Sequence, residues 1–411
     1  MVESLGAGVG VQVALFGSGI ILARSLGPAG RGDLAVALIL PSVALQLACF
    51  GLPSAATYYV ARNKGAARAI ARQLAPVAAL QALLALGLLV GLTEVFLGGK
   101  AESTQTIGML TLAGVPPLAV HLYGLHLLQG LGDLRWFNAF RITIPATFVI
   151  GLAIGLLSGL TVVSCTLIWL ASVVTVSGAL VVSLVFRVRV AERRAHANLE
   201  GRVPTRRQMV RFGATGFLAQ VSPVETFRID TLVVAGLFSS EVVGYYAVAL
   251  SISNVPRFLA DGIVAVAYPQ ISAQDANAAR ASTRRYMLAA IVACGGATAA
   301  LALAAPYIIP LLFGRAFSPA VALGVALVIG AGLISIRRTG SDCLRAQGRA
   351  GLATRIEVVA LVVLAAGFLV FAPSGQGLGV AYALIASAAV GLSLTLLALR
   401  TTTRDDSAAD T

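Results

Sequence analysis

Residues 209–272 read MVRFGATGFLAQVSPVETFRIDTLVVAGLFSSEVVGYYAVALSISNVPRFLADGIVAVAYPQIS, and this stretch decides the fold class. It contains two long apolar runs that are interrupted by charges: Glu225, Arg228 and Asp230 in the first, and Arg257 and Asp261 in the second. The whole chain is 58% hydrophobic and 11% charged, with a mean hydropathy of +0.90, which soluble domains rarely approach. We therefore expect an integral membrane protein. An ionisable group inside a bilayer needs a partner or a water-filled cavity, so these charges predict such a cavity.

Apolar runs fill most of the 411 residues. A spanning helix needs about 20 apolar residues, so the chain has room for about twelve with their loops. We predict an all-α integral membrane protein whose roughly twelve transmembrane helices form two six-helix bundles. Residues 1–187 make the N-terminal bundle, 188–211 a basic cytoplasmic linker, 212–400 the C-terminal bundle and 401–411 a disordered cytoplasmic tail. Pro41 and Pro53 in the second span, residues 33–61, predict a kinked or broken helix.

Lysine and arginine are divided unevenly between the two sides that these spans define. Of the 30 such residues, 24 fall on the side of both termini, 4 on the opposite side, and Arg228 and Arg257 within spans. Basic loops mark the cytoplasmic side, so we predict that both termini are cytoplasmic. The net charge of +13 does not indicate nucleic-acid binding, because the basic residues occupy short loops without interleaved aromatic residues.

Two short similarities indicate an internal repeat. A shift of 212 residues aligns Gly32–Leu38 (GDLAVAL) with Gly244–Leu250 (GYYAVAL), and the same shift aligns Ala67–Arg72 (ARAIAR) with Ala279–Arg284 (ARASTR). Six spans separate the copies, so the repeats share one orientation and an axis along the membrane normal relates them. Carriers built in this way hold substrate near mid-membrane and alternate between inward- and outward-open states. The repeat therefore predicts a transporter, not an enzyme.

The interior charges have two interpretations. In the first, they compensate one another: Glu225 and Arg228 share a helix face, and Arg257 and Asp261 have the i, i+4 spacing of an internal ion pair. Asp230 follows Arg228 by two residues, so in a helix it points elsewhere. In the second interpretation, Arg228 and Arg257 line a hydrated cavity and bind an anionic headgroup, because a guanidinium fits phosphate through two parallel hydrogen bonds.

Other polar residues add candidates to both interpretations. Arg24 and Arg31 lie near the non-cytoplasmic mouth of the first bundle and are candidates for the same cationic lining. Glu225, Asp230 and Asp261 are candidates for charge compensation or for proton or sodium coupling. The four cysteines lie in or beside apolar spans without a CxxC pair, so we expect small buried side chains and no metal site or cofactor.

Several segments resemble bacterial polysaccharide flippases of the O-antigen and capsule type. In the first bundle these are Ala23-Arg-Ser-Leu-Gly27 followed by Pro28, and Gly51-Leu-Pro53. In the second they are Arg228-Ile-Asp-Thr-Leu-Val-Val-Ala-Gly236, Val243-Gly-Tyr-Tyr-Ala247, Tyr268-Pro-Gln-Ile-Ser272, Pro310-Leu-Leu-Phe-Gly314, Leu344-Arg-Ala-Gln-Gly348 and Gly377-Leu-Gly-Val-Ala381. Their order and spacing cover nearly the whole chain. The chain is thereby identified as a member of the multidrug/oligosaccharidyl-lipid/polysaccharide (MOP) exporter superfamily.

This resemblance implies a function and a location. Such flippases move polyprenyl-pyrophosphate-linked oligosaccharide from the cytoplasmic to the outer leaflet of the bacterial plasma membrane, for capsule, exopolysaccharide or O-antigen-like assembly. The family pattern implies a cationic cavity for the pyrophosphate and sugars, and it supports Arg24 and Arg228 more than Arg257. Membrane lipids and possible glycan polymerases or glycosyltransferases are the implied partners.

Two relatives in the superfamily are alternatives. Lipid II flippases usually have two further helices and more basic residues in the second helix, whereas the second span here has no basic residue before Arg62. Cation-coupled multidrug exporters often carry an acidic residue in the first helix, and residues 5–23 contain none. Both departures favour the polysaccharide branch. The three interior acids, Glu225, Asp230 and Asp261, leave the multidrug exporter as an alternative function. The short outer connectors disfavour a membrane glycosyltransferase.

Overall fold

The computed structural model describes residues 2–99, 102–195, 203–220, 228–371 and 377–405, and within these ranges the regular structure is helical. The chain forms two compact units, residues 1–26 with 33–232 and residues 27–32 with 233–411. The first contains α1 (Val2–Cys49, except residues 27–32), α2 (Leu52–Arg62), α3 (Ala67–Leu97), α4 (Glu102–Leu112), α5 (Val115–Leu131), α6 (Leu134–Gly155), α7 (Val162–Ala195), α8 (Arg206–Gln220) and the start of α10 (Ile229–Leu237). The second contains the rest of α10, α11 (Ser240–Ser253), α12 (Val255–Ser272), α13 (Ala276–Phe313), α14 (Ala320–Ala346), α15 (Ala350–Phe371) and α16 (Leu378–Asp405).

The described helices account for most of the expected spans. Nine are long and apolar enough to cross a membrane, and the bent pair formed by Thr104–Leu112 and Val115–Leu131 gives up to ten. One of the nine, Gly6–Cys49, has 44 residues and is kinked at Gly27. Its length of about 66 Å is twice the hydrocarbon thickness, so it supplies two spans. The first apolar run of residues 209–272 falls on α8 and α10, with residues 221–227 outside the described part.

The second span is broken where the chain leaves helical dihedral angles. Phe50 and Gly51 both have positive φ, 42° and 68°, and α2 starts at Leu52 with Pro53 in its first turn. Pro41 lies inside α1 without a break. The Cys49 carbonyl, at the end of α1, accepts a hydrogen bond of 3.0 Å from Gln81 of α3. The predicted break is therefore confirmed, and a neighbouring helix satisfies the exposed backbone group.

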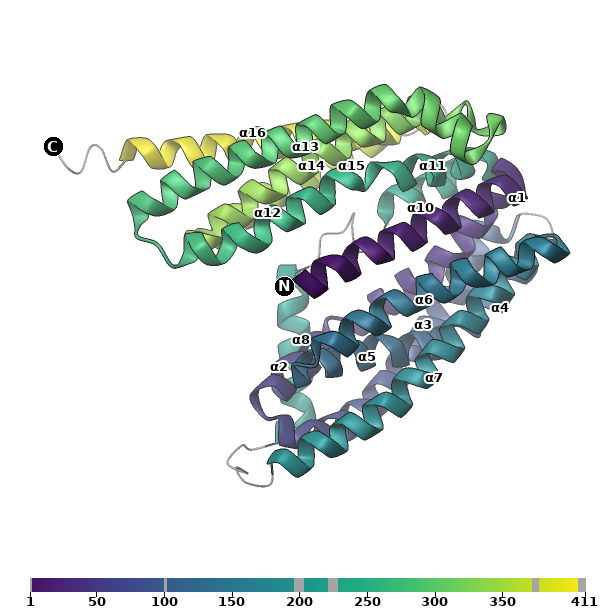
Figure 1. Ribbon diagram of the computed structural model, residues 1–411, viewed down its shortest axis with the longest axis horizontal. Coiled ribbons are helices and arrows are strands. Elements are labelled where there is room, and N and C mark those ends of the chain that lie inside the picture. Colours follow the sequence, from purple (N-terminus) through teal and green to yellow (C-terminus); the bar gives the residue numbers. More distant parts are fainter. Residues whose placement is uncertain (1, 100–101, 196–202, 221–227, 372–376, 406–411) are drawn as a thin grey trace. The chain divides into compact units, whose positions relative to one another are not determined.

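The N-terminal unit is built around α5. This helix packs against α2, α3, α6 and α7, as Figure 1 shows. A buried cluster joins α1, α6 and α7 and contains Leu22, Leu34, Phe148, Leu152, Cys165, Trp169 and Val173. All four cysteines of the chain are buried and free, as the sequence analysis expected. Helix α7 continues to Ala195, so the first third of the predicted linker, residues 188–195, is helical.

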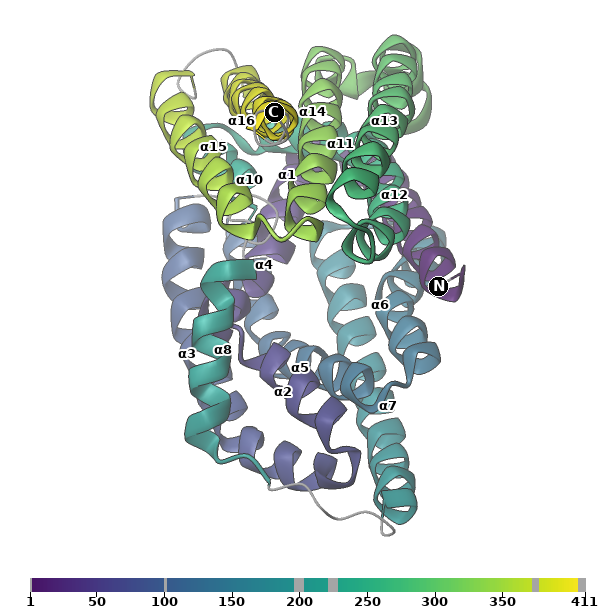
Figure 2. The same ribbon diagram turned by 90° about the vertical axis from the view of Figure 1, so that its left-hand side faces the viewer.

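The C-terminal unit is built around α14. This helix packs against α11, α12, α13, α15 and α16, and Figure 2 shows it between α13 and α16. Small residues on α14 allow α13 and α16 to pack closely against it. A Cβ added at Gly340 would clash with Thr395 of α16 and would lie in tight contact with Met287 of α13. Because α14 touches every other long helix of the unit, its polar side chains have partners within the unit.

Two glycines make reciprocal backbone contacts within the C-terminal unit. A Cβ at Gly32 would overlap the carbonyl oxygen of Ser240, and a Cβ at Gly244 would overlap the carbonyl oxygen of Pro28. The repeat offset of 212 residues relates Gly32 to Gly244 and Pro28 to Ser240. Each contact thus joins a residue of segment 27–32 to a residue of the segment that the 212-residue offset relates to it. The contacts support the internal repeat from an observation independent of sequence similarity.

Alanine at either glycine should destabilise the protein. Gly32→Ala and Gly244→Ala each force a backbone shift, at a cost of about 1–3 kcal/mol in the free energy of unfolding. The measurement is thermal unfolding of the purified protein in detergent. Gly295→Ala on α13 is the control, because nothing lies within 4 Å of a Cβ there and the helix gains about 1 kcal/mol from alanine. Equal melting temperatures for Gly244→Ala and Gly295→Ala would contradict the close contact.

Candidate functional site

Helix α14 carries charges in its interior. Arg337 and Arg338 precede its last residue, Ala346, by nine and eight residues, which places them about 12 Å from the helix end. Asp342 and Arg345 follow on the next two turns. By hydropathy this span was expected to end at residue 336, which put both arginines among the 24 basic residues on the side of the termini. The helix runs ten residues further because the small Thr339-Gly340-Ser341 segment packs in the centre of the unit.

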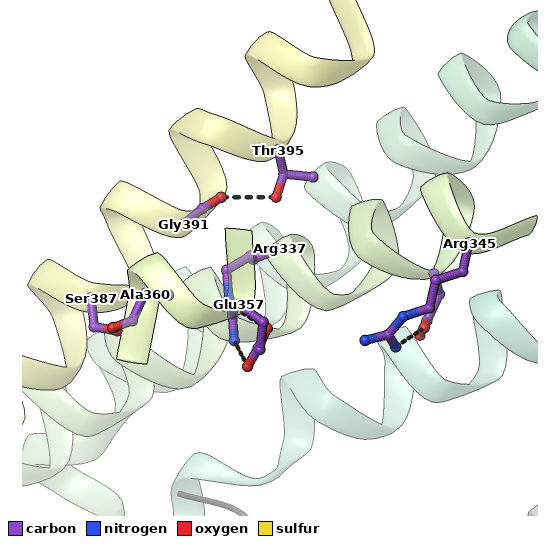
Figure 3. Close-up of polar contacts among 8 residues, drawn as sticks. Arg337, Arg345, Glu357, Ala360, Ser387, Gly391 and Thr395 are labelled. Atoms are coloured by element: carbon purple, nitrogen blue, oxygen red, sulfur yellow. Dashed lines mark hydrogen bonds and ion pairs between the residues drawn. The ribbon is translucent and has the colours of Figure 1, made fainter. Parts of the chain in front are cut away.

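Arg337 forms an ion pair with Glu357 between α14 and α15. Its two terminal nitrogens donate to the Glu357 carboxylate oxygens at 2.5 and 3.2 Å, as Figure 3 shows. The arginine side chain is only 11% exposed and the glutamate 32%. On the other side, a Cβ at Gly391 of α16 would lie 2.6 Å from the Arg337 Cδ, so this glycine makes room for the arginine stem. The pair joins three helices and has a structural role.

A second group of charges lies between α12 and α14. The α12–α14 charge cluster consists of Asp261, Arg338, Asp342 and Arg345. Arg345 donates to Asp342 at 3.0 Å, and Asp261 lies 3.7 Å from Arg338 across the two helices (Figure 3 shows the Arg345 contact). Asp342 also lies within electrostatic reach of Arg338 and Asp261.

The cluster is partly open to its surroundings. The side chains of Asp261, Arg338 and Arg345 are 44%, 37% and 38% exposed. Asp261 lies 11 residues before the end of α12, about 16 Å along the axis. Exposed charges are unstable against lipid tails, so we expect this face of the C-terminal unit to be in contact with water. The face can therefore hold a polar ligand.

A third pair lies at the start of α10. The Arg228 Nε is 3.8 Å from the Asp230 Oδ1, and the aspartate side chain is 5% exposed. In a continuous helix Asp230 would lie on another face than Arg228, as predicted from the spacing of two residues. In the structure Arg228 has φ of 48° and precedes the helix, so helical spacing does not apply and its side chain turns back toward Asp230.

The remaining predicted residues occupy separate places. Arg24 is exposed on α1, three residues before the kink at Gly27, and Arg31 is half-buried in the segment that belongs to the C-terminal unit. Arg257 is half-buried on α12, one turn before Asp261. Glu225 lies outside the described residues. The structure thus pairs Arg228 with Asp230 and brings Asp261 to Arg338, a partner that the sequence analysis did not consider.

One signal in the sequence would have found the missed residues. Arg338 and Asp342 are four residues apart, and Asp342 and Arg345 three apart, so within a helix they share one face. Helical spacing was considered only for the charges in residues 225–261, because the dense run of arginines in residues 337–349 is typical of a cytoplasmic connector.

Solved structures show which class of protein has this fold. The chain is similar to the lipid II flippase MurJ in its inward-closed conformation, with a TM-score of 0.77, 13% identity, and coverage of 97% of this chain and 88% of that one. It is also similar to an inward-facing multidrug resistance MATE family transporter of the MOP superfamily (TM-score 0.68, 18% identity, 96% of both chains). A third similar structure is a MOP superfamily transporter from Pyrococcus furiosus, described as having a binding pocket of reverse polarity (TM-score 0.55, 16% identity, 98% and 97%). The chain therefore shares the fold of these transporters.

The family follows from the sequence match. The polysaccharide biosynthesis protein family matches residues 4–275, which is more than half of the chain, and the chain belongs to this family. A comparison with curated protein sequences gives no match. The predicted superfamily and all-α transporter fold are confirmed.

The Arg337–Glu357 pair should behave as a structural ion pair. Arg337→Met leaves Glu357 without its cation and should lower the free energy of unfolding by about 2 kcal/mol, a reduced value because Glu357 is one-third exposed. The double variant Arg337→Met/Glu357→Leu should recover most of this loss, because apolar side chains of similar size can replace such a pair. Chemical unfolding in detergent measures both. The control is Arg284→Met on the exposed face of α13; if it matches Arg337→Met, the pair contributes nothing specific.

Proposed function

We propose that the protein flips polyprenyl-pyrophosphate-linked oligosaccharide from the cytoplasmic to the outer leaflet of a bacterial plasma membrane by alternating access. The product would enter capsule, exopolysaccharide or O-antigen-like assembly. The observation that carries the proposal is the match of residues 4–275 to the polysaccharide biosynthesis family. The MOP transporter fold supports it, because such carriers move substrate without covalent chemistry. On this proposal both termini are cytoplasmic, and glycan polymerases or glycosyltransferases are partners.

The physical task is to move a charged headgroup through an apolar layer. Transfer of bare ionised groups into a medium of low dielectric costs tens of kcal/mol. A carrier lowers this barrier when fixed charges and cavity water replace the lost hydration. Guanidinium groups suit the task because they bind phosphate through two parallel hydrogen bonds. Four arginines are the proposed headgroup ligands: Arg24, Arg31, Arg228 and Arg257.

Nearby carboxylates balance these arginines when no substrate is bound. The contact of Asp230 with Arg228 and that of Asp261 with Arg338 show that acids and bases are interleaved within the spans. The proposed roles of Asp230, Asp261 and Glu225 are charge compensation and coupling to protons or sodium. A carboxylate that loses its arginine to substrate is the natural place for a compensating cation.

A second candidate function is lipid II transport. The structure of the lipid II flippase MurJ has a TM-score of 0.77 to this chain. The two functions differ in the lipid that is moved. Multidrug export is the alternative from the MATE branch, and it would use the interior acids instead of the arginines.

Export of surface polysaccharide tests the proposal. A deletion strain should accumulate lipid-linked glycan inside, and wild type should clear it. Arg24→Ala and Arg228→Ala should reduce clearance by about tenfold at matched membrane levels, since each removes a charged phosphate ligand. Arg284→Ala, an exposed residue of α13, is the charge-matched control and should clear glycan normally.

The same strains separate the alternatives. If surface glycan stays intact while the deletion sensitises cells to cationic dyes, the protein is an exporter, and Glu225 and Asp230 become the residues to test. If the deletion instead blocks cell-wall synthesis and accumulates lipid II, the protein is a lipid II flippase. Normal glycan export in the deletion strain with neither defect would refute transport of this class of lipid.

A further inference from the structure

Two hollows lie within the N-terminal unit. The apolar groove has a volume of about 390 Å³ and runs between α3, α5 and α7, with apolar side chains and Tyr123 as its lining. The Tyr123 hydroxyl donates to Gln81, so this polar group is already satisfied. The polar pocket has a volume of about 480 Å³ and is lined by Lys64, Asp133 and Arg187 together with apolar side chains.

The polar pocket continues the apolar groove along two helices. On α5, Leu127 lines the groove and Leu131, four residues later, lines the pocket. On α7, Leu184 lines the groove and Arg187, three residues later, lines the pocket. Residues three or four apart share one face of a helix. One helical face of α5 and one of α7 therefore lead from the groove into the pocket.

The apolar groove exists because α3 presents small side chains to it. Five alanines of α3 line the groove: Ala71, Ala75, Ala78, Ala79 and Ala82. Leucines lie at other positions of the same helix, and Leu80, Leu83 and Leu84 are 52–65% exposed, as expected for a surface against lipid tails. From residue 71 to residue 82 the groove follows about 16 Å of helix, close to half the hydrocarbon thickness. It therefore has the length of one leaflet.

The polar pocket lies at the depth of lipid headgroups. Arg187 follows Val162, the first residue of α7, by 25 residues, which is about 38 Å of helix and more than the hydrocarbon thickness. Trp136 is 42% exposed, and its ring centroid lies 4.3 Å from the Arg187 guanidinium carbon. Exposed tryptophans are typical of the boundary between hydrocarbon and water. The groove is thus placed for a lipid chain and the pocket for its headgroup.

The charge of the polar pocket favours an anion. Arg187 donates to the Asp133 carboxylate, and its Nε donates to the Ser183 hydroxyl at 3.3 Å. A Cβ at Gly132 would lie 3.2 Å from the Lys64 Nζ, which places the ammonium at the turn between α5 and α6. The two cations and one carboxylate that line the pocket give it a net charge of +1. A headgroup with one negative charge complements it while the Arg187–Asp133 pair stays intact.

We propose that the groove and the pocket together bind one anionic glycerophospholipid of the surrounding bilayer. An acyl chain lies along the alanines of α3, the phosphate lies beside Lys64, and Asp133 accepts a hydrogen bond from a headgroup hydroxyl. The bound lipid fills the space between α3, α5 and α7 and thereby stabilises the folded N-terminal unit. This inference does not depend on the proposed function, because it concerns a resident lipid and not the transported one.

Binding of defined lipids to the purified full-length protein tests the proposal. The protein is delipidated in detergent and titrated with phosphatidylglycerol, and dissociation constants are taken from the rise in melting temperature, because a ligand of the folded state stabilises it. Phosphatidylcholine with the same chains has no net charge and should bind about fivefold more weakly. Glycerol 3-phosphate has no chain and should give no comparable rise.

One variant tests each half of the site. Lys64→Gln should weaken phosphatidylglycerol binding about fivefold and leave phosphatidylcholine binding unchanged. Ala79→Leu should weaken binding of both lipids about tenfold, because the leucine displaces about two methylene groups of the chain. Both residues are exposed, so the variants should fold, and Ala75→Leu is a second variant in the groove.

Two matched controls lie outside the site. Ala179→Leu adds the same side chain to an exposed position of α7, and Arg284→Gln removes the same charge from an exposed position of α13. Neither should change the dissociation constants. If Lys64→Gln and Arg284→Gln weaken phosphatidylglycerol binding equally, only the overall charge matters and the proposal is overturned. Equal effects of Ala79→Leu and Ala179→Leu would show that no chain occupies the groove.

Two further probes identify other occupants. If glycerol 3-phosphate stabilises the protein as strongly as phosphatidylglycerol, the pocket binds a soluble phosphate and the lipid proposal is wrong. Undecaprenyl pyrophosphate tests whether a polyprenyl lipid occupies the site instead. If it displaces phosphatidylglycerol at equal concentration, and Lys64→Gln and Ala79→Leu both weaken its binding, the site belongs to that lipid and the proposal of a resident phospholipid is overturned.

Discussion

The constraint on which the structure depends is that charge inside a bilayer must be neutralised or hydrated. The C-terminal unit meets it in two ways. Arg337 and Glu357 neutralise each other among α14, α15 and α16, with Gly391 leaving space for the arginine stem. The α12–α14 charge cluster is one-third or more exposed at three of its four side chains and so depends on water. One helix, α14, carries both kinds of charge on different faces.

The same constraint explains how the helices are interrupted. A break in a spanning helix leaves backbone carbonyls that lipid cannot satisfy. At the break after α1 the Cys49 carbonyl accepts from Gln81, whose own side-chain oxygen accepts from Tyr123. At the start of α10 the backbone of Arg228 leaves helical geometry, and the charged side chain meets Asp230. Irregular backbone and polar side chains therefore occur together, each making the other stable.

Under the proposed function, for which the family match and the fold are the support, the protein is a carrier whose chemistry is electrostatic. The proposed arginine ligands then suit a substrate that carries phosphate, and the carboxylates beside them compensate their charge when no substrate is bound. In this view the interior acids do not argue for a cationic substrate, because arginines lie beside them: Asp230 contacts Arg228, Asp261 contacts Arg338, Asp342 contacts Arg345 and Glu357 contacts Arg337.

The sequence by itself determined the membrane class, the approximate number of spans, the internal repeat and the broken second span, because these depend on local hydropathy, proline positions and short-range similarity. The tertiary structure alone decided the pairing of charges. Helical spacing from Arg257 to Asp261 could not reveal that Arg338 approaches Asp261, because that contact joins α12 to α14 across 77 residues of chain. It also could not reveal that Arg337 lies within a helix, since only packing against α15 and α16 makes a charged segment stable there. Local patterns fix where helices run, whereas the partners of buried charges depend on which helices pack side by side.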